Sequence, residues 1–171
     1  MKHKTKGFTL IETLVSLFIL SIAITASFAV ISTNLTTATY VKNSFIASGL
    51  AQEGLEIARN LRDSDWVANP PRPFGSFGSA DSISDGTYRV QWDSQNLMSG
   101  NWNSEPLNIN SQGLYNYDGA ADPTNVATPF YRGVTIERVS DSEIRVYVEV
   151  IWRGHLKEYS VSGEEHLYDW Y

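Results

Sequence analysis

The sequence predicts an α+β protein in which one long N-terminal α-helix packs on a C-terminal antiparallel β-sheet. Three observations lead to this fold class. No proline precedes Pro70, so a single helix can run from about Phe8 to Arg62. The stretch from Thr13 to Ile31 carries no charge. The C-terminal third contains alternating runs joined by turns so short that neighbouring strands must be antiparallel.

The composition indicates a folded, acidic chain. Of its 171 residues, 19% are charged and 12% are aromatic, which argues against wholesale disorder. Thirteen basic and nineteen acidic residues give a net charge of −6, and three of the lysines lie within the first six residues. The rest of the chain is therefore more acidic still, and this acidic charge argues against nucleic-acid binding. The absence of cysteine excludes disulfides, thiolate metal sites and cysteine nucleophiles.

The uncharged stretch is long enough to span a membrane. Its nineteen residues would extend about 28 Å as an α-helix, close to the roughly 30 Å of a hydrocarbon core. The basic residues before it favour a cytoplasmic N-terminus, with the rest of the chain on the other side of the membrane.

The second half of the expected helix is one-sided, and we expect its apolar stripe to cover one face of the sheet. The stripe consists of Ile46, Leu50, Ile57 and Leu61. The polar side opposite consists of Gln52, Glu56, Arg59 and Arg62. Three apolar residues fall off the stripe and either form its edges or meet other copies of the helix: Val41, Phe45 and Leu55. Gly49 and Gly54 weaken the helix by about 1 kcal/mol each.

The remaining residues are expected to form loops and then a meander of strands. All six prolines lie between Pro70 and Pro129, in a zone rich in turn residues. The expected strands are Thr87–Asp93, Gly133–Val139, Glu143–Arg153, Leu156–Ser162 and His166–Tyr171. The chain thus divides into a basic segment at 1–7, a membrane-spanning helix at 8–31, an amphipathic helix at 32–62 and a β-rich globular domain at 63–171.

Residues 6–12, Lys-Gly-Phe-Thr-Leu-Ile-Glu, carry the most specific pattern. With the basic residues before them and the apolar run after them, they resemble the prepilin-type cleavage and methylation signal of type IV pilins and type II secretion pseudopilins. The resemblance implies a pilin-like fold and a leader peptide at 1–7 that is cut between Gly7 and Phe8. It further implies N-methylation of the Phe8 amine and assembly of the 8–31 helix into a filament core.

Glu12 needs an explanation of its own, because an ionised carboxylate in a membrane helix costs several kcal/mol unless it is paired. By the resemblance, Glu12 neutralises the Phe8 amine of a neighbouring subunit. The alternative is a carboxylate at the headgroup boundary, one turn into the helix, where the helix dipole favours it.

A second resemblance concerns the type of subunit. Residues 50–59, the Val-Ile-Trp-Arg-Gly run at 150–154 and the terminal Asp-Trp-Tyr resemble V-type minor pilins and the pseudopilin I group. The expected function is therefore that of a minor-pilin-like structural subunit without enzymatic activity. The implied partners are other pilin or pseudopilin subunits, prepilin peptidase and an inner-membrane assembly platform. The implied location is the inner membrane, spanned once, and then a periplasmic or extracellular filament.

Two alternatives remain open at this stage. One is a pseudopilin of a type II secretion system. The other, of a different class, is a secreted binding or enzymatic domain with an ordinary signal peptide, for which Ser27-Phe-Ala29 offers a small-x-small cleavage site.

Other groups of polar and aromatic residues predict no catalytic, metal or cofactor site. The histidines His3, His155 and His166 have no metal-ligand spacing. Asp118 and Asp122, with Asn116 and Asn125, are typical of an Asx-rich turn, although they could supply oxygen ligands to Ca²⁺. The aromatic residues near the C-terminus are expected to pack on the sheet rather than to form a binding platform: Trp152, Tyr168, Trp170 and Tyr171.

Overall fold

The structure is a computed structural model that describes residue 7, residues 9–154 and residues 157–170. Its contacts divide the chain into two units, residues 1–42 and residues 43–171. Within the described residues the elements, in chain order, are α1 (Leu10–Val67), β1 (Gly86–Tyr88), β2 (Asn108–Ile109), β3 (Tyr115–Asn116), the short 3-10 helix η1 (Gly119–Ala121), β4 (Val126–Ala127), β5 (Phe130–Ser140), β6 (Glu143–Arg153) and β7 (Glu158–Tyr168).

The long helix is confirmed, and it passes through Gly49 and Gly54 without a break. Its expected end at Arg62 is wrong, because α1 continues to Val67. The buried carboxylate of Asp65 explains the extension. Its Oδ1 accepts hydrogen bonds from the backbone N of Gly78 and from Nη1 of Arg72, both at 3.1 Å. These contacts hold the last turn of the helix against the loop that follows it.

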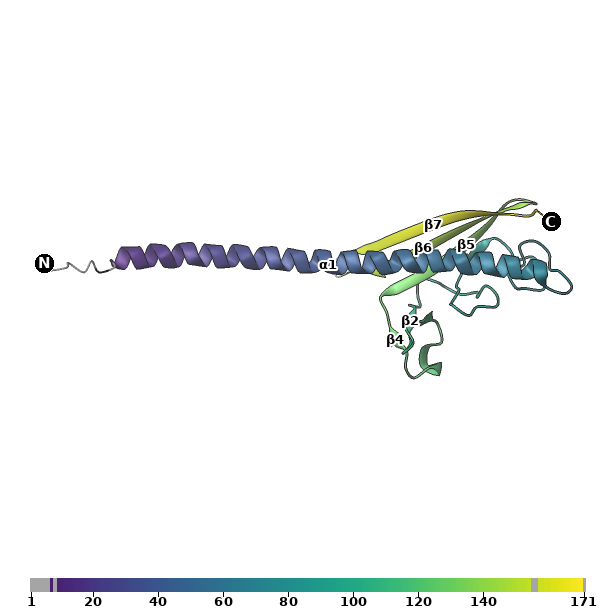
Figure 1. Ribbon diagram of the computed structural model, residues 1–171, viewed down its shortest axis with the longest axis horizontal. Coiled ribbons are helices and arrows are strands. Elements are labelled where there is room, and N and C mark those ends of the chain that lie inside the picture. The colour runs from purple at the N-terminus through teal and green to yellow at the C-terminus, as the bar shows by residue number, and fades with distance from the viewer. Residues whose placement is uncertain (1–6, 8, 155–156, 171) are drawn as a thin grey trace. The chain divides into compact units, whose positions relative to one another are not determined.

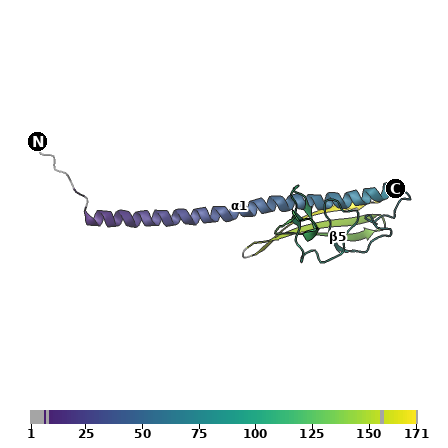
Figure 2. The ribbon, with the colours of Figure 1, turned by 90° about the horizontal axis from the view of Figure 1, so that it is seen from below.

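The main sheet has four strands in the order β1-β5-β6-β7, and every neighbouring pair is antiparallel. Figures 1 and 2 show β5, β6 and β7 lying along the last part of α1, so the helix covers one face of the sheet. The helix and the sheet together therefore form the α+β arrangement expected from the sequence.

The strand limits agree in part with the sequence. The strand Glu143–Arg153 is confirmed at both ends, and β5 extends the expected Gly133–Val139 in both directions. The expected break at Gly163 is wrong, because β7 is one continuous strand in which Gly163 pairs with Val148. A Cβ atom at Gly163 would lie 3.2 Å from Cδ1 of Leu55, so this glycine allows the helix to lie close to β7.

The region before β5 differs most from expectation. The expected strand Thr87–Asp93 shrinks to β1, followed by one isolated bridge from Arg89 to Met98. Val90 is buried as the alternation predicted, but Trp92 is about half exposed. The zone expected to be loops also contains a small sheet in the order β3-β2-β4. Strands of two residues are too short to show any periodicity in the sequence.

The helix face that meets the sheet consists of smaller residues than expected. Leu50 and Leu61 are buried as expected, whereas Ile46 and Ile57 are only half-buried. Arg62 is buried, so its expected place on the polar face is wrong. The buried residues of α1 are Ala47, Leu50, Ala51, Gly54, Ala58, Leu61, Arg62 and Asp65. Small side chains along this face let the helix backbone approach the valine-rich face of β6 closely.

Gly54 marks the closest approach of helix and sheet. A Cβ atom there would lie 2.9 Å from Cγ1 of Val148 and 3.4 Å from Cδ of Arg132. Gly49, which lies five residues earlier in the same helix, has open space where a Cβ would stand. The two glycines therefore cost the helix the same in propensity, but only Gly54 has a packing reason within the chain.

The pair of glycines provides a matched test. Replacement Gly54→Leu should lower the free energy of unfolding by about 1–3 kcal/mol, because the added side chain must push α1 away from β6. Replacement Gly49→Leu should leave it unchanged or raise it by about 0.5–1 kcal/mol, because leucine is the better helix former. Urea unfolding of the full chain in detergent, followed by circular dichroism, measures both. Equal losses from the two substitutions would contradict the close packing at Gly54.

Candidate functional site

The start of α1 is a capping box formed by Thr9 and Glu12. The backbone N of Glu12 donates to Oγ1 of Thr9 at 3.3 Å, and the backbone N of Thr9 donates to Oε2 of Glu12 at 3.2 Å. The Thr9 hydroxyl lies 3.2 Å from the same oxygen. Each side chain thus satisfies a backbone donor that the first turn of a helix leaves open.

The Thr-x-x-Glu spacing of this motif is visible in the sequence, and the capping role of Glu12 adds to the dipole and pairing roles expected of it. Glu12 is exposed, and its Oε1 has no hydrogen bond among the described residues. Gly7 is also exposed and lies outside the helix. Phe8 and residues 1–6 lie outside the described residues, so the cleavage and methylation assigned to Phe8 remain predictions.

The first part of α1 presents an apolar surface that is exposed among the described residues. Every residue from Thr9 to Lys42 is exposed, and within the described residues α1 is the one helix long and apolar enough to cross a membrane. Such a surface requires lipid or other helices around it.

Five hydroxyl groups between Thr13 and Ser27 are satisfied by the helix itself. Each donates to a backbone carbonyl three or four residues earlier, at 2.7–2.8 Å. The donors are Thr13, Ser16, Ser21, Thr25 and Ser27. A hydroxyl that needs no water can be placed in hydrocarbon at little cost, so these residues are compatible with a membrane-spanning helix.

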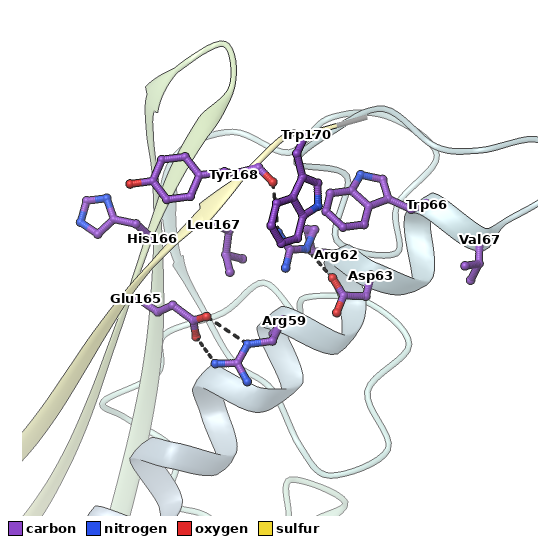
Figure 3. A pocket seen from close by; sticks show the side chains of 10 residues that line it. All are labelled: Arg59, Arg62, Asp63, Trp66, Val67, Glu165, His166, Leu167, Tyr168 and Trp170. Atoms are coloured by element: carbon purple, nitrogen blue, oxygen red, sulfur yellow. Dashed lines mark hydrogen bonds and ion pairs between the residues drawn. The ribbon is translucent and has the colours of Figure 1, made fainter.

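At the other end of α1 a groove of about 580 Å³ opens between the end of the helix and the end of β7 (Figure 3). The rings of Trp66 and Trp170 lie on one side of it, with centroids 6.0 Å apart and planes at 42°. The guanidinium of Arg62 lies 4.3 Å from the centroid of Trp66. The groove is lined by Arg59, Arg62, Asp63, Trp66, Val67, Glu165, His166, Leu167, Tyr168 and Trp170.

Ion pairs fix the charged side chains of this groove. Arg59 donates from Nε and Nη2 to the two carboxylate oxygens of Glu165, at 3.0 and 2.7 Å, as drawn in Figure 3. This bidentate pair raises the pKa of Arg59 above its ordinary value. Arg62 donates from Nε to Oδ1 of Asp63 at 2.5 Å and from Nη1 to the carbonyl of Tyr168 at 3.2 Å. The groove therefore has charged side chains held by ion pairs beside an aromatic pair, in which Trp170 is exposed and Trp66 is half-buried.

Comparison with known proteins addresses the N-terminal region. A family model described as the prokaryotic N-terminal methylation motif matches residues 2–28. The chain carries the type IV pilin and pseudopilin signal. No curated protein and no solved structure matches the chain. The matched residues contain Gly7, Phe8 and Glu12, on which the sequence resemblance was based.

The pilin signal indicates the broad class of protein to which this architecture corresponds. Together with the uncovered apolar helix, it indicates a pilin-like or pseudopilin protein that is processed by prepilin peptidase and anchored in the membrane by one span. The signal also points to a structural filament subunit and to association with other pilin subunits.

The other residues singled out in the sequence have local roles. Asp122 accepts from both N and Oγ1 of Thr124, which is the Asx-type turn expected there, and Asp118 accepts from Nε2 of Gln91. Among the described residues, no three histidine, aspartate or glutamate side chains are grouped as a metal ion requires. His166 is an exposed strand residue, as expected, whereas His3 and His155 lie outside the described part.

The C-terminal aromatic residues do not share one role. Trp152 is buried and stacks on Tyr159 with centroids 5.4 Å apart, as expected for sheet packing. Trp170 is 77% exposed, so its expected packing on the sheet is wrong, because it lies beyond the last strand and packs beside Trp66. Tyr171 is outside the described residues.

The capping box predicts an effect of Thr9→Ala. Loss of the Thr9 hydroxyl removes the acceptor of the Glu12 amide, so the first turn should fray, at a cost of about 0.5–2 kcal/mol in local helix stability. Hydrogen exchange of the full chain in detergent should show faster exchange at Glu12, and Thr9→Ser should restore protection. Unchanged exchange in Thr9→Ala would exclude the cap.

A second prediction concerns His166 on the outer side of β7. Its Nδ1 lies 2.7 Å from Oε1 of Glu143 and its Nε2 lies 3.3 Å from Oε1 of Glu164. The hydrogen bond with Glu143 and then that with Glu164 raise the pKa of His166 above its ordinary 6.5. Because the folded state favours the protonated ring, its stabilising effect is complete below the unfolded pKa and is lost as pH rises through the folded pKa.

The measurement is the unfolding temperature of the full chain across about pH 5 to pH 8. The chain should lose more stability than His166→Gln as the pH rises over this range. Parallel curves for the two proteins would show that the carboxylates do not act on the imidazole.

Proposed function

We propose that this chain is a minor-pilin-like structural subunit of a type IV pilus or a related filament. It is cut between Gly7 and Phe8, N-methylated at Phe8 and assembled through its N-terminal helix. The leader is 1–7 and the filament-core helix 8–31, and the amphipathic helix that follows from 32 ends at Val67, where the outer globular domain continues. The observation that supports the proposal is an exposed apolar helix that begins within the methylation motif at residues 2–28.

In a filament Glu12 can cap the helix with one carboxylate oxygen and pair with a neighbouring subunit through the other. Its Oε2 accepts the hydrogen bonds of the capping box, while Oε1 has no partner among the described residues. Oε1 can therefore meet the cationic Phe8 amine of a neighbouring subunit. A carboxylate paired in this way loses most of its desolvation penalty and fixes the register between helices.

The proposed partners follow from the same cycle. Prepilin peptidase removes the leader at the cytoplasmic side, an inner-membrane assembly platform extracts the subunit, and other pilin or pseudopilin subunits surround it in the filament. The N-terminus lies in the cytoplasm and the body lies outside. In a type II secretion pseudopilus the cycle would be the same. A neighbouring gene for a pilus retraction ATPase would favour the pilus, whereas genes for a secretin and a secretion ATPase would favour the pseudopilus.

The first experiment is the intact mass and N-terminal sequence of the protein from cells that contain a prepilin peptidase. The proposal expects a membrane-retained chain that starts at N-methylated Phe8. A soluble chain that starts near Val30 would instead assign cleavage to the Ser27-Phe-Ala29 site, and the body would then be a free secreted domain.

Glu12 provides the second test. Glu12→Ala should leave leader cleavage intact but reduce the protein in sheared filaments by about tenfold or more, since an unpaired amine in the core costs several kcal/mol. Glu12→Gln is the matched control, because its side-chain oxygen still caps Thr9 but carries no charge. If the glutamine variant assembles normally, the contribution of Glu12 is capping and the charge-pairing role is wrong.

A further inference from the structure

The strand β7 (Glu158–Tyr168) forms one outer edge of the main sheet, as the strand order β1-β5-β6-β7 shows (Figure 1). Just before β7 begins, the backbone N of Gly154 donates to the carbonyl of Lys157 at 2.9 Å. Just after β7 ends, the backbone N of Asp169 donates to the carbonyl of Ser142 at 2.9 Å. Because hydrogen-bonded pairs alternate along an antiparallel ladder, the odd-numbered residues of β7 bond to β6. The backbone groups of its even-numbered residues therefore point to the open edge.

The outward backbone groups of β7 form a continuous row of unpaired donors and acceptors. Among the described residues, no other segment donates to or accepts from the backbone of this row. The row consists of Glu158, Ser160, Ser162, Glu164 and His166, and it extends about 27 Å. At its end the carbonyl of Tyr168 accepts from Nη1 of Arg62 at 3.2 Å, so α1 closes the edge at that point.

This edge lacks the features by which sheets usually avoid pairing with other chains. The strand β7 has eleven residues, no proline and no shift of register against β6, whereas β1 at the opposite edge has three residues. The middle of β7, Ser160–Gly163, carries no charge. The flanking Glu158 is paired with Arg153, and Glu164 is paired with Arg145. A long edge of this kind is a template for a further strand.

Apolar side chains beside the edge determine which pattern of residues such a strand needs. Val161 lies on the helix side of β7 and is half-buried against the core, as is Leu55 of α1. Leu55 lies close to the edge because Gly163 has no side chain, and a Cβ there would be 3.2 Å from its Cδ1. The even-numbered residues of β7, on the other face, are exposed. An added strand therefore continues the core if apolar residues on its helix side alternate with polar residues on the other face.

We propose that an extended segment of a different filament subunit adds to β7 as a fifth strand along residues 158–166. It runs antiparallel, like every other pair of this sheet, and its apolar side chains pack against Val161 and Leu55. A main-chain strand is the partner that fits, because it supplies donors and acceptors at the spacing of the open ladder. The inference rests on the proposed function, in which a minor subunit is surrounded by other subunits rather than by copies of itself.

Photo-cross-linking tests the occupant of the edge. The photoreactive residue p-benzoyl-L-phenylalanine replaces Ser160 in the full chain, cells that assemble the filament are irradiated, and the cross-linked peptides are sequenced by mass spectrometry. The inference expects a product with a different filament subunit, joined within a segment of alternating apolar and polar residues. A product with a second copy of this chain, a product only with a protein outside the filament, or no product in filaments that contain the chain would each overturn it.

The variant Ser162→Pro separates main-chain pairing from side-chain contact. Because the N–H of Ser162 points away from β6, proline removes an outward donor without breaking the ladder inside the chain. The cross-link yield from position 160 should fall by about tenfold or more, whereas the matched control Ser162→Ala should leave it unchanged. Equal yields from the two variants would exclude main-chain pairing. Circular dichroism in detergent checks the fold, and Glu164→Pro against Glu164→Ala repeats the comparison if Ser162→Pro does not fold.

Hydrogen exchange gives an independent readout of the same edge. In the detergent-solubilised chain the amide of Ser162 should exchange faster than those of Val161 and Gly163, which bond to β6. In the filament the exchange of Ser162 should slow by about tenfold or more, whereas its two neighbours should change little. Residue-level mass spectrometry measures the three rates. Equally fast exchange of Ser162 in both states would contradict an added strand.

The outcomes separate the inference from the function on which it rests. If the unsubstituted chain is processed and enters filaments, but the cross-link and the protection of Ser162 are absent, the added strand is wrong and the proposed function stands. Failure of the unsubstituted chain to be processed or to enter filaments overturns both.

Discussion

The body depends on the close contact of α1 with the sheet, and Arg132 holds that contact together. Its side chain is fully buried between helix and strands. Nη1 donates to the backbone carbonyl of Leu50 at 3.1 Å and to Oε2 of Glu53 at 2.9 Å, and Nη2 donates to the carbonyl of Val90 at 2.7 Å. One guanidinium thus links α1, β5 and the segment after β1. A buried cation is tolerable here because fixed acceptors face both Nη atoms, although the buried Nε has no hydrogen-bond partner among the described residues.

The burial of Arg132 limits the size of the side chains that can pack beside it. The side chain passes Gly54, where a Cβ would lie 3.4 Å from its Cδ and closer still to Val148. The small residues of the helix face, the valines of β6 and the arginine therefore form one packing unit. If the helix moved outward, the apolar contacts and the hydrogen bonds of Arg132 would weaken together, so position and register of α1 are determined jointly.

The part of α1 up to residue 42 and the part from residue 43 to Val67 have different surroundings. In the first part every described side chain is exposed, and five hydroxyl groups between Thr13 and Ser27 donate to carbonyls of the helix itself, so these five groups do not depend on water. In the last part the polar groups bond to other segments, as Asp65 does with Arg72 and Gly78. The first part therefore suits lipid or other helices, whereas the last part fixes the body from which the groove at Trp66 and Trp170 is built.

The sequence by itself determined the features that depend on local pattern. The methylation signal, the uncharged span, the unbroken helix and the strand Glu143–Arg153 are all encoded in residues close together in the chain. The capping box of Thr9 and Glu12 is also local, because its Thr-x-x-Glu spacing is present in the sequence.

The tertiary structure alone decided which face of α1 is buried and where the helix ends. Periodicity favours large apolar residues such as Ile46 and Ile57, but the sheet selects the small ones because they allow the shortest distance between backbones. It also buries Arg62, which the sequence places on the polar side, since Asp63 and the carbonyl of Tyr168 accept its hydrogen bonds. The groove joins residues about a hundred positions apart, and a contact between such distant residues leaves no periodic signal in the sequence.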